Sequence, residues 1–159
     1  GVNDLFYPSS YIGDLADVRT VAALEEPIGR LETLLEAEPQ AVACDLHPKY
    51  NSTLVAQRQN LPPIPVQHHY AHILSCMAEN DCFDPCIGLS FDGTGYGTDG
   101  TIWGGEILLA DYRGFQRLGR HMGRQEKALV QQPVYVLGAA AFPSDTRARQ
   151  PHSRRLHQV

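Results

Sequence analysis

The stretch that decides the fold is CIGLSFDGTGYGTDGTIWGGE, residues 86–106. Its first six residues have the apolar composition of a buried strand. Four glycines follow within residues 92–100, and this density favours a tight turn with exposed backbone and excludes a helix. Residues 101–111 and 115–121 are predicted to return as strands. We therefore expect a strand hairpin here, and we call residues 92–106 the glycine hairpin.

The residues before this stretch alternate between helical and strand-like patterns. Apolar side chains recur at steps of three and four in the first long segment, which is the pattern of an amphipathic helix, and Pro39 ends it. The predicted helices are residues 17–38, 51–59 and 68–79, and the predicted strands are residues 41–44 and 64–67. Helices and strands in this order, followed by a hairpin, predict an α/β fold with a second half that starts near Pro85.

The composition limits the classes of function. The chain of 159 residues is 43% hydrophobic, which is enough for one globular core. Its net charge of -5 opposes the broad basic face that nucleic-acid binding needs, so no nucleic-acid partner is expected. No apolar run approaches the roughly 20 residues of a membrane span, and the first residues lack a signal-peptide pattern. These features predict a cytoplasmic protein without a membrane partner.

The four cysteines show no C-x-x-C spacing, so neither a zinc ribbon nor a redox pair is indicated. Free cysteines usually behave as small buried hydrophobic residues. We therefore expect reduced thiols.

A histidine pair lies in QHHYAH, residues 67–72. His68 and His72 are four residues apart, so on a helix their rings project from the same face and can reach one metal ion. His69 takes the place of the glutamate in an H-E-x-x-H protease motif, and it points roughly 100° away, which favours a structural role. A third ligand must come from elsewhere, and Cys76 is a local candidate. The alternative is that the histidines only cap the helix or form hydrogen bonds in a polar cleft.

The glycine hairpin has a pattern that favours phosphate binding. Glycine has no β-carbon, so main-chain N–H groups can approach an anion closely. Asp92, Gly93, Thr94 and Gly95 are the predicted phosphate loop, in which Asp92 could hold magnesium and Thr94 could donate to a phosphate oxygen. The segment lacks G-K-[ST] and is followed by a strand, so it is neither a P-loop nor a dinucleotide fingerprint. An ordinary Asp-Gly hairpin remains the alternative.

Several segments together resemble a known family. CDLHPKY (residues 44–50), VQHHYAH (residues 66–72) and FDGTGYGTDGTIWGGE (residues 91–106) resemble the C-terminal domain of HypF-type carbamoyltransferases, which mature [NiFe]-hydrogenases. The segment YIGDL (residues 11–15) is similar to an Ile-Gly-Asp-Leu segment of that family. The resemblance covers roughly residues 9–120, and the long glycine-rich string is its most specific part.

The resemblance implies an actin/Hsp70-like (ribonuclease H-like) ATPase fold, of which part is present, with an active site between two lobes. This fold is shared with the tRNA threonylcarbamoyl-transfer family. Residues 1–84 would be a portion of the first lobe with the histidine pair, and residues 85–123 the start of the second lobe with the glycine hairpin. Residues 124–159 depart from the pattern and are expected to be a divergent tail, either disordered or artefactual.

The resemblance also implies a reaction. The family makes carbamoyl-adenylate from carbamoyl phosphate and ATP, and passes the carbamoyl group to the C-terminal cysteine of HypE. Its histidine pair, here His68 and His72, binds a metal, zinc or iron. The family's third metal ligand, an aspartate, and its adenosine-binding loops belong downstream of about Arg120, where the pattern is lost, and its upstream domains do not match this sequence. The alternatives are an O-carbamoyltransferase for a small-molecule hydroxyl, or a non-catalytic fragment that binds metal or nucleotide.

Overall fold

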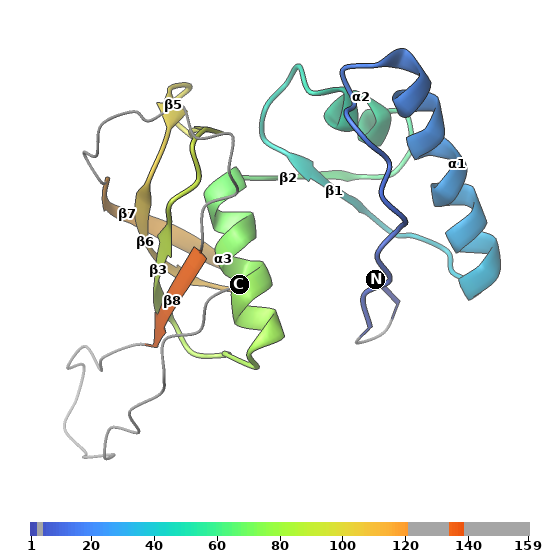
Figure 1. Ribbon diagram of the computed structural model, residues 1–159. Coiled ribbons are helices and arrows are strands. Elements are labelled where there is room, and N and C mark those ends of the chain that lie inside the picture. Colours follow the sequence, from blue (N-terminus) through green and yellow to red (C-terminus); the bar gives the residue numbers. More distant parts are fainter. Residues whose placement is uncertain (3–4, 121–133, 139–159) are drawn as a thin grey trace. The chain divides into compact units, whose positions relative to one another are not determined.

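The computed structural model describes residues 1–2, 5–120 and 134–138. The chain divides into two compact units, residues 1–66 and residues 67–159 (Figure 1). In the described part of the chain, no helix combines the length and the apolar character that a membrane span requires.

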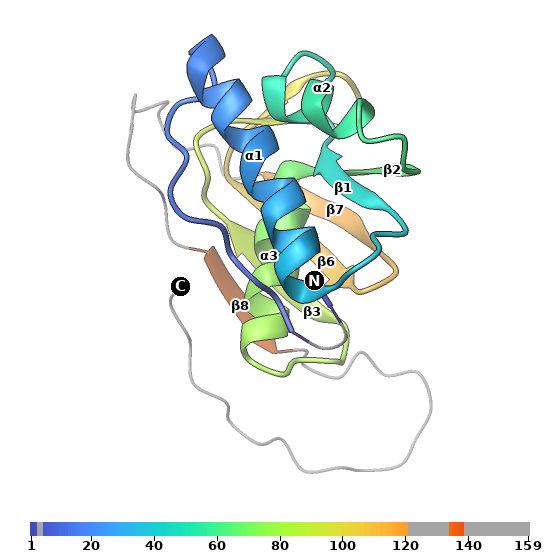
Figure 2. The same ribbon diagram turned by 90° about the vertical axis from the view of Figure 1, so that its right-hand side faces the viewer.

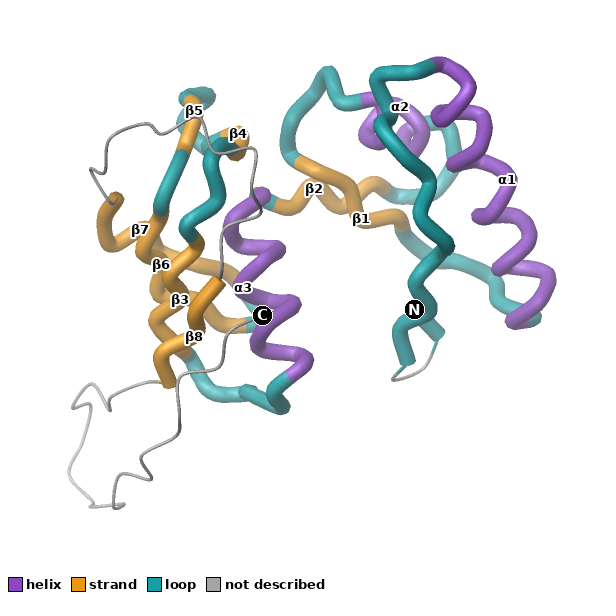
Figure 3. The backbone as a smooth tube through the Cα atoms, in the orientation of Figure 1, coloured by secondary structure: helices purple, strands orange, loops and turns teal. Residues whose placement is uncertain are grey.

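The first unit consists of two helices and a pair of parallel strands (Figure 3). Its elements are α1 (Val18–Leu35), β1 (Val42–Asp45), α2 (Asn51–Gln57) and β2 (Pro63–Val66). The side chain of Asp17 caps α1 by accepting from the N–H of Arg19, and the helix ends at Glu36 in a left-handed conformation. β1 and β2 are parallel, and α2 lies in the connection between them, as parallel neighbours require a crossover. The helices and strands predicted here are confirmed, with ends shifted by up to three residues.

The second unit is one helix on an antiparallel sheet, together with the two short strands of the glycine hairpin. Its elements are α3 (His68–Glu79), β3 (Cys86–Ser90), β4 (Gly95–Tyr96), β5 (Ile102–Trp103), β6 (Glu106–Asp111), β7 (Gly114–Arg120) and β8 (Val134–Gly138). The strand order is β7-β6-β3-β8, and every neighbouring pair is antiparallel. α3 lies along one face of this sheet (Figures 1 and 2).

The core of the second unit joins α3 to the sheet. Ile73 and Met77 of α3 are fully buried and belong to one apolar cluster with Leu108 of β6. Gly88 of β3 lets the helix approach, because a β-carbon there would lie 2.3 Å from Cδ1 of Ile73. This close packing fixes α3 against β3, and the chain leaving β3 returns to the first turn of α3.

Two sequence predictions need correction. The strand predicted over residues 101–111 is broken at Gly104 and Gly105, so it forms β5 and β6. No element was predicted after residue 123, but β8 pairs with β3 in the register Ser90↔Val134. Its run of β-branched and aromatic residues is the signal that should have predicted a strand. The rest of the predicted tail (residues 124–159), namely residues 124–133 and 139–159, lies outside the described residues.

The two compact units do not coincide with the predicted lobes. The units meet between Val66 and Gln67, so the histidine helix and the glycine hairpin belong to the same unit. The compact units are defined by packing within this chain, whereas the predicted lobes are parts of a complete ATPase fold, of which this chain would be a portion. The lobe boundary near Pro85 therefore stays a prediction.

Candidate metal centre and glycine hairpin

The histidine pair lies on the first two turns of α3. The rings of His68 and His72 have centroids 4.9 Å apart and stand almost perpendicular to each other, at 85°. Gln67 is the N-cap, and its side-chain oxygen accepts from the N–H of Tyr70. Both imidazoles are partly exposed, with 32% and 44% of the side-chain surface accessible. The pair is thus adjacent, on one helix face and open to a ligand.

Asp92 brings a carboxylate to this pair. It follows β3 by two residues, and its Oδ2 lies 2.5 Å from Nε2 of His68 and 3.6 Å from Nε2 of His72. Its Oδ1 accepts from the N–H of Gly93. The hydrogen bond from His68, and then that from His72, hold the pKa of Asp92 well below its usual range. The carboxyl group is therefore ionised at neutral pH.

His68, His72 and Asp92 fit the donor set of a divalent transition metal. One ligand atom from each lies within 4.8 Å of the others, and no other group of three such ligands occurs among the described residues. Ligand atoms of a tetrahedral zinc ion, with bonds of about 2.0–2.1 Å, lie about 3.4 Å apart. Small side-chain movements would therefore suffice to place an ion between them.

Cys76, the candidate third ligand on the same helix, is buried in the apolar core instead. Asp92 was predicted as a phosphate or magnesium residue, and its place beside the histidines was missed.

His69 faces the interior and is completely buried. Because the side-chain oxygen of Gln67 accepts from Tyr70, its amide nitrogen must donate, both to the carbonyl of Tyr96 at 3.3 Å and to Nδ1 of His69 at 3.1 Å. Nδ1 is then an acceptor, which assigns the ring proton to Nε2. Burial lowers the pKa of His69, so the ring is neutral. These contacts agree with the predicted structural role of His69.

Packing explains two glycines of the hairpin. A β-carbon on Gly95 would lie 2.6 Å from Cε1 of His69, and one on Gly97 would lie 2.1 Å from Nε1 of Trp103. Such distances are far below van der Waals contact. Gly95 is therefore needed for the hairpin to pack on α3, and Gly97 for the two arms of the hairpin to pack on each other at Trp103.

The four residues of the predicted phosphate loop have different environments. Asp92 and Gly95 contact the histidine helix, whereas Gly93 and Thr94 are exposed in the segment between β3 and β4. The N–H of Gly93 is used by Asp92. A phosphate group would thus meet the exposed side of Gly93 and Thr94, and the role of the whole loop stays a prediction.

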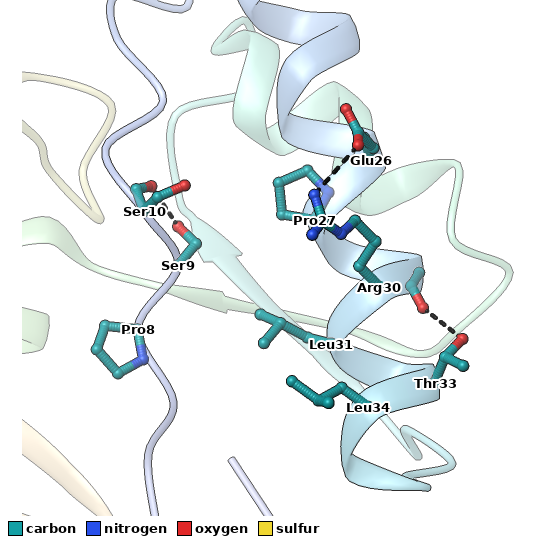
Figure 4. A pocket seen from close by; sticks show the side chains of 10 residues that line it. Pro8, Ser9, Ser10, Glu26, Pro27, Arg30, Leu31, Thr33 and Leu34 are labelled. Atoms are coloured by element: carbon teal, nitrogen blue, oxygen red, sulfur yellow. Dashed lines mark hydrogen bonds and ion pairs between the residues drawn. The ribbon is translucent and has the colours of Figure 1, made fainter.

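The first unit contains a separate groove. It has a volume of ≈ 770 Å³ and lies between residues 8–10 and α1 (Figure 4). Leu31 and Leu34 line it, and its charged residues are Glu26 and Arg30, which form an exposed ion pair at 3.4 Å. None of the predicted site residues lines this groove. It is therefore not part of the candidate metal centre.

Two family models match the chain. The HypF Kae1-like domain matches residues 1–79, and the second subdomain of the carbamoyltransferase Kae1-like domain matches residues 88–126. Carbamoyltransferase HypF of Rhizobium leguminosarum bv. viciae is 43% identical over 114 residues, which covers 72% of this chain. Carbamoyltransferase HypF of Synechocystis is 44% identical over 133 residues, which covers 83% of it. The chain contains both helices and strands, as the predicted α/β class states, and this content is consistent with the match to the Kae1-like domain.

A solved structure is also similar. It is a crystal structure of full-length HypF in a phosphate- and nucleotide-bound form, 48% identical, with a TM-score of 0.66 over 69% of this chain and 14% of that one. The chain spans 15% and 16% of the length of the two curated relatives. The chain belongs to the HypF family of carbamoyltransferases and represents a part of its Kae1-like domain.

Proposed function

We propose that this chain carries the metal and phosphate centre of a HypF-type carbamoyltransferase. The observation that carries the proposal is the meeting of His68, His72 and Asp92 at the base of the glycine hairpin, in a chain of this family. The complete reaction belongs to proteins several times longer than this chain.

His68, His72 and Asp92 would hold a divalent ion, zinc or iron, since imidazole suits both. When bound, such an ion supplies Lewis acidity that polarises a carbamoyl oxygen. Without the ion, the hydrogen bond between Nε2 of His68 and the ionised carboxylate of Asp92 keeps these two groups adjacent, and a bound ion would take the place of its proton. Because Oδ2 of Asp92 lies beside both imidazoles, we assign Asp92 to the metal centre and not to magnesium, which would instead accompany the nucleotide.

The phosphate of the nucleotide would bind in the glycine hairpin at the segment between β3 and β4. Gly93 and Thr94 are exposed there, and the Thr94 hydroxyl can donate to a phosphate oxygen. The similar HypF structure was solved with phosphate and nucleotide, which supports a nucleotide ligand for this domain. The metal centre and this adjacent segment would then hold two parts of one carbamoyl-adenylate molecule.

The reaction that we propose is transfer of the carbamoyl group from carbamoyl-adenylate to the C-terminal cysteine of a HypE-like partner. The cysteine sulfur bonds to the carbamoyl carbon, the bond to the phosphate oxygen breaks, AMP leaves, and the thiol proton is released. ATP and carbamoyl phosphate are the substrates of the complete enzyme, and a cytoplasmic location belongs to the same proposal. A small-molecule hydroxyl would use the same centre and differ only in the acceptor.

The test uses the complete protein that contains this domain. His72→Ala should abolish transfer to a peptide that ends in cysteine, while ATP-dependent formation of the adenylate continues. Arg113→Gln, an exposed residue in the turn between β6 and β7, should leave both reactions unchanged. Transfer at the unsubstituted rate in the His72→Ala protein would refute the proposed role. If only a hydroxyl compound accepts the group, the O-carbamoyltransferase alternative holds instead.

A further inference from the structure

We infer that Arg117 is a positioning residue, which fixes the glycine hairpin by pairing with the buried Glu106 and stacking on Trp103, and thereby sets the position of Asp92. The inference rests on the proposed metal centre and deepens it. It concerns β7, the strand that carries Arg117, and β7 contributes no ligand to that centre.

Glu106 lies at the base of the glycine hairpin. It is the first residue of β6 and is paired with Ser90, the last residue of β3. The two arms of the hairpin therefore meet at this pair, and Asp92 is only two residues beyond Ser90. Glu106 is 0% exposed, so its carboxylate cannot be solvated by bulk water. A side chain that fixes the position of Glu106 therefore also fixes Ser90, from which the chain continues to Asp92.

Arg117 of β7 compensates this buried charge with two parallel hydrogen bonds. Its Nε donates to Oε2 of Glu106 at 2.7 Å, and its Nη2 donates to Oε1 at 2.9 Å. Oε1 of Glu106 also accepts from the N–H of Gly104 at 3.2 Å. A single carboxylate thus connects β7 to the main chain of the returning arm.

The same guanidinium reaches two further points of the hairpin. Its central carbon lies 4.1 Å from the centre of the Trp103 ring, in a cation–π contact. The indole N–H of Trp103 donates to Oδ1 of Asp99 at 3.0 Å, and Nη1 of Arg117 lies 3.8 Å from Oδ2 of Asp99. Arg117 therefore contacts the returning arm at Trp103, its turn at Asp99 and its base at Glu106.

Stability alone does not account for this arrangement. A buried ion pair commonly adds little net stability, because desolvation of both charges offsets their attraction. A bulge in the pairing of β6 with β7 lies between Ile107 and Leu108, next to Glu106, and bulges commonly redirect side chains near functional sites. With two of its nitrogens bonded to Glu106, Arg117 is also poorly placed to bind phosphate itself.

The test uses the only tryptophan of the chain, Trp103, as a reporter of the hairpin. Trp103 is 3% exposed, so opening of the hairpin should shift its fluorescence emission to longer wavelength. Arg117→Gln should show this shift and weaken zinc binding by about tenfold, as loss of groups that support a metal site commonly does. Arg117→Lys keeps the charge without the two-pronged contact and should be intermediate. The matched control, Arg113→Gln on the adjacent turn, should change neither reading.

A paired variant separates positioning from charge compensation. Glu106→Gln combined with Arg117→Gln removes both charges and keeps an acceptor for the N–H of Gly104, so the protein should fold even if Arg117→Gln alone does not. We expect this variant to keep the shifted emission and the weaker zinc binding. Emission and zinc affinity equal to those of the unsubstituted chain, in this variant or in Arg117→Gln, would overturn the inference. Should neither glutamine variant fold, the same two readings on Arg117→Lys decide.

The outcomes also separate this inference from the proposed function. If the unsubstituted chain binds no zinc, the metal centre fails, and the emission of Trp103 alone decides whether Arg117 positions the hairpin. If zinc binds and His68→Ala abolishes binding, but Arg117→Gln behaves as Arg113→Gln does, only the positioning role fails.

Discussion

Replacement of Gly95 by alanine tests whether the hairpin must rest on α3 for the metal centre to form. An added β-carbon would lie 2.6 Å from Cε1 and 2.8 Å from Nδ1 of His69, and 2.9 Å from Cβ of His68. Carbon atoms in favourable contact are about 3.5–4.0 Å apart, so the overlap with the ring is about 0.9 Å or more. His69 is fully buried and bonded to Gln67, so it cannot move aside. The hairpin must therefore move away from the helix.

The expected cost of Gly95→Ala is about 1–3 kcal/mol in the free energy of unfolding, the usual range for an overpacked buried site. Asp92 lies three residues before Gly95, so displacement of the hairpin should also separate its carboxylate from the histidines and weaken zinc binding by about tenfold or more. Urea unfolding and a competitive zinc titration measure the two effects. Gly104→Ala is the matched control, because the atom nearest to its β-carbon would be 3.9 Å away. If Gly95→Ala and Gly104→Ala gave the same stability and the same zinc affinity, the packing argument would be refuted.

Three further predictions concern other contacts of the second unit. Gln67→Leu removes the amide that bonds to Tyr96, so we expect a loss of about 1–3 kcal/mol in urea unfolding; an unchanged free energy would contradict this. Burial raises the pKa of Cys86 from 9.0 to about 12, so Cys86 should react with iodoacetamide at pH 8 more slowly than the partly exposed Cys82, and equal rates by mass spectrometry would contradict this. Because that pKa is raised in the folded state, the stabilising effect of the neutral Cys86 thiol is complete below pH 9 and is lost as the pH rises through about 12. The free energy of unfolding should therefore fall less over this pH range in Cys86→Ala. Thr94→Val should weaken ATP binding, measured by calorimetry, and leave zinc affinity unchanged; a reversed pattern would reassign Thr94 to the metal centre.

Local patterns in the sequence predicted most of the elements. The three- and four-residue apolar steps of α1 and the density of glycine after β3 are signals that each segment carries by itself. The spacing of His68 and His72 predicted a shared helix face for the same reason. β8 was missed because it follows a long stretch that has no clear pattern, although its own composition is that of a strand.

Asp92, the third residue of the candidate site, could not be predicted from the sequence because its position depends on tertiary packing. Asp92 is 24 residues from His68 along the chain, and it reaches the histidine only because β3 runs back along α3. No local sequence pattern predicts that Asp92 lies beside His68. The reason for Gly95 was equally hidden, since a glycine needed for packing on His69 looks the same in the sequence as one needed to approach a phosphate.

X-ray absorption spectroscopy of the purified chain with one equivalent of zinc is the most direct test of the metal centre. We predict nitrogen from two imidazoles at about 2.0–2.1 Å and a carboxylate oxygen at about 2.0–2.2 Å. One imidazole should be lost in His72→Ala, and the carboxylate contribution should weaken in Asp92→Asn. An ion coordinated by sulfur or by water alone, or a spectrum that neither substitution changes, would contradict the claim that His68, His72 and Asp92 form one metal site.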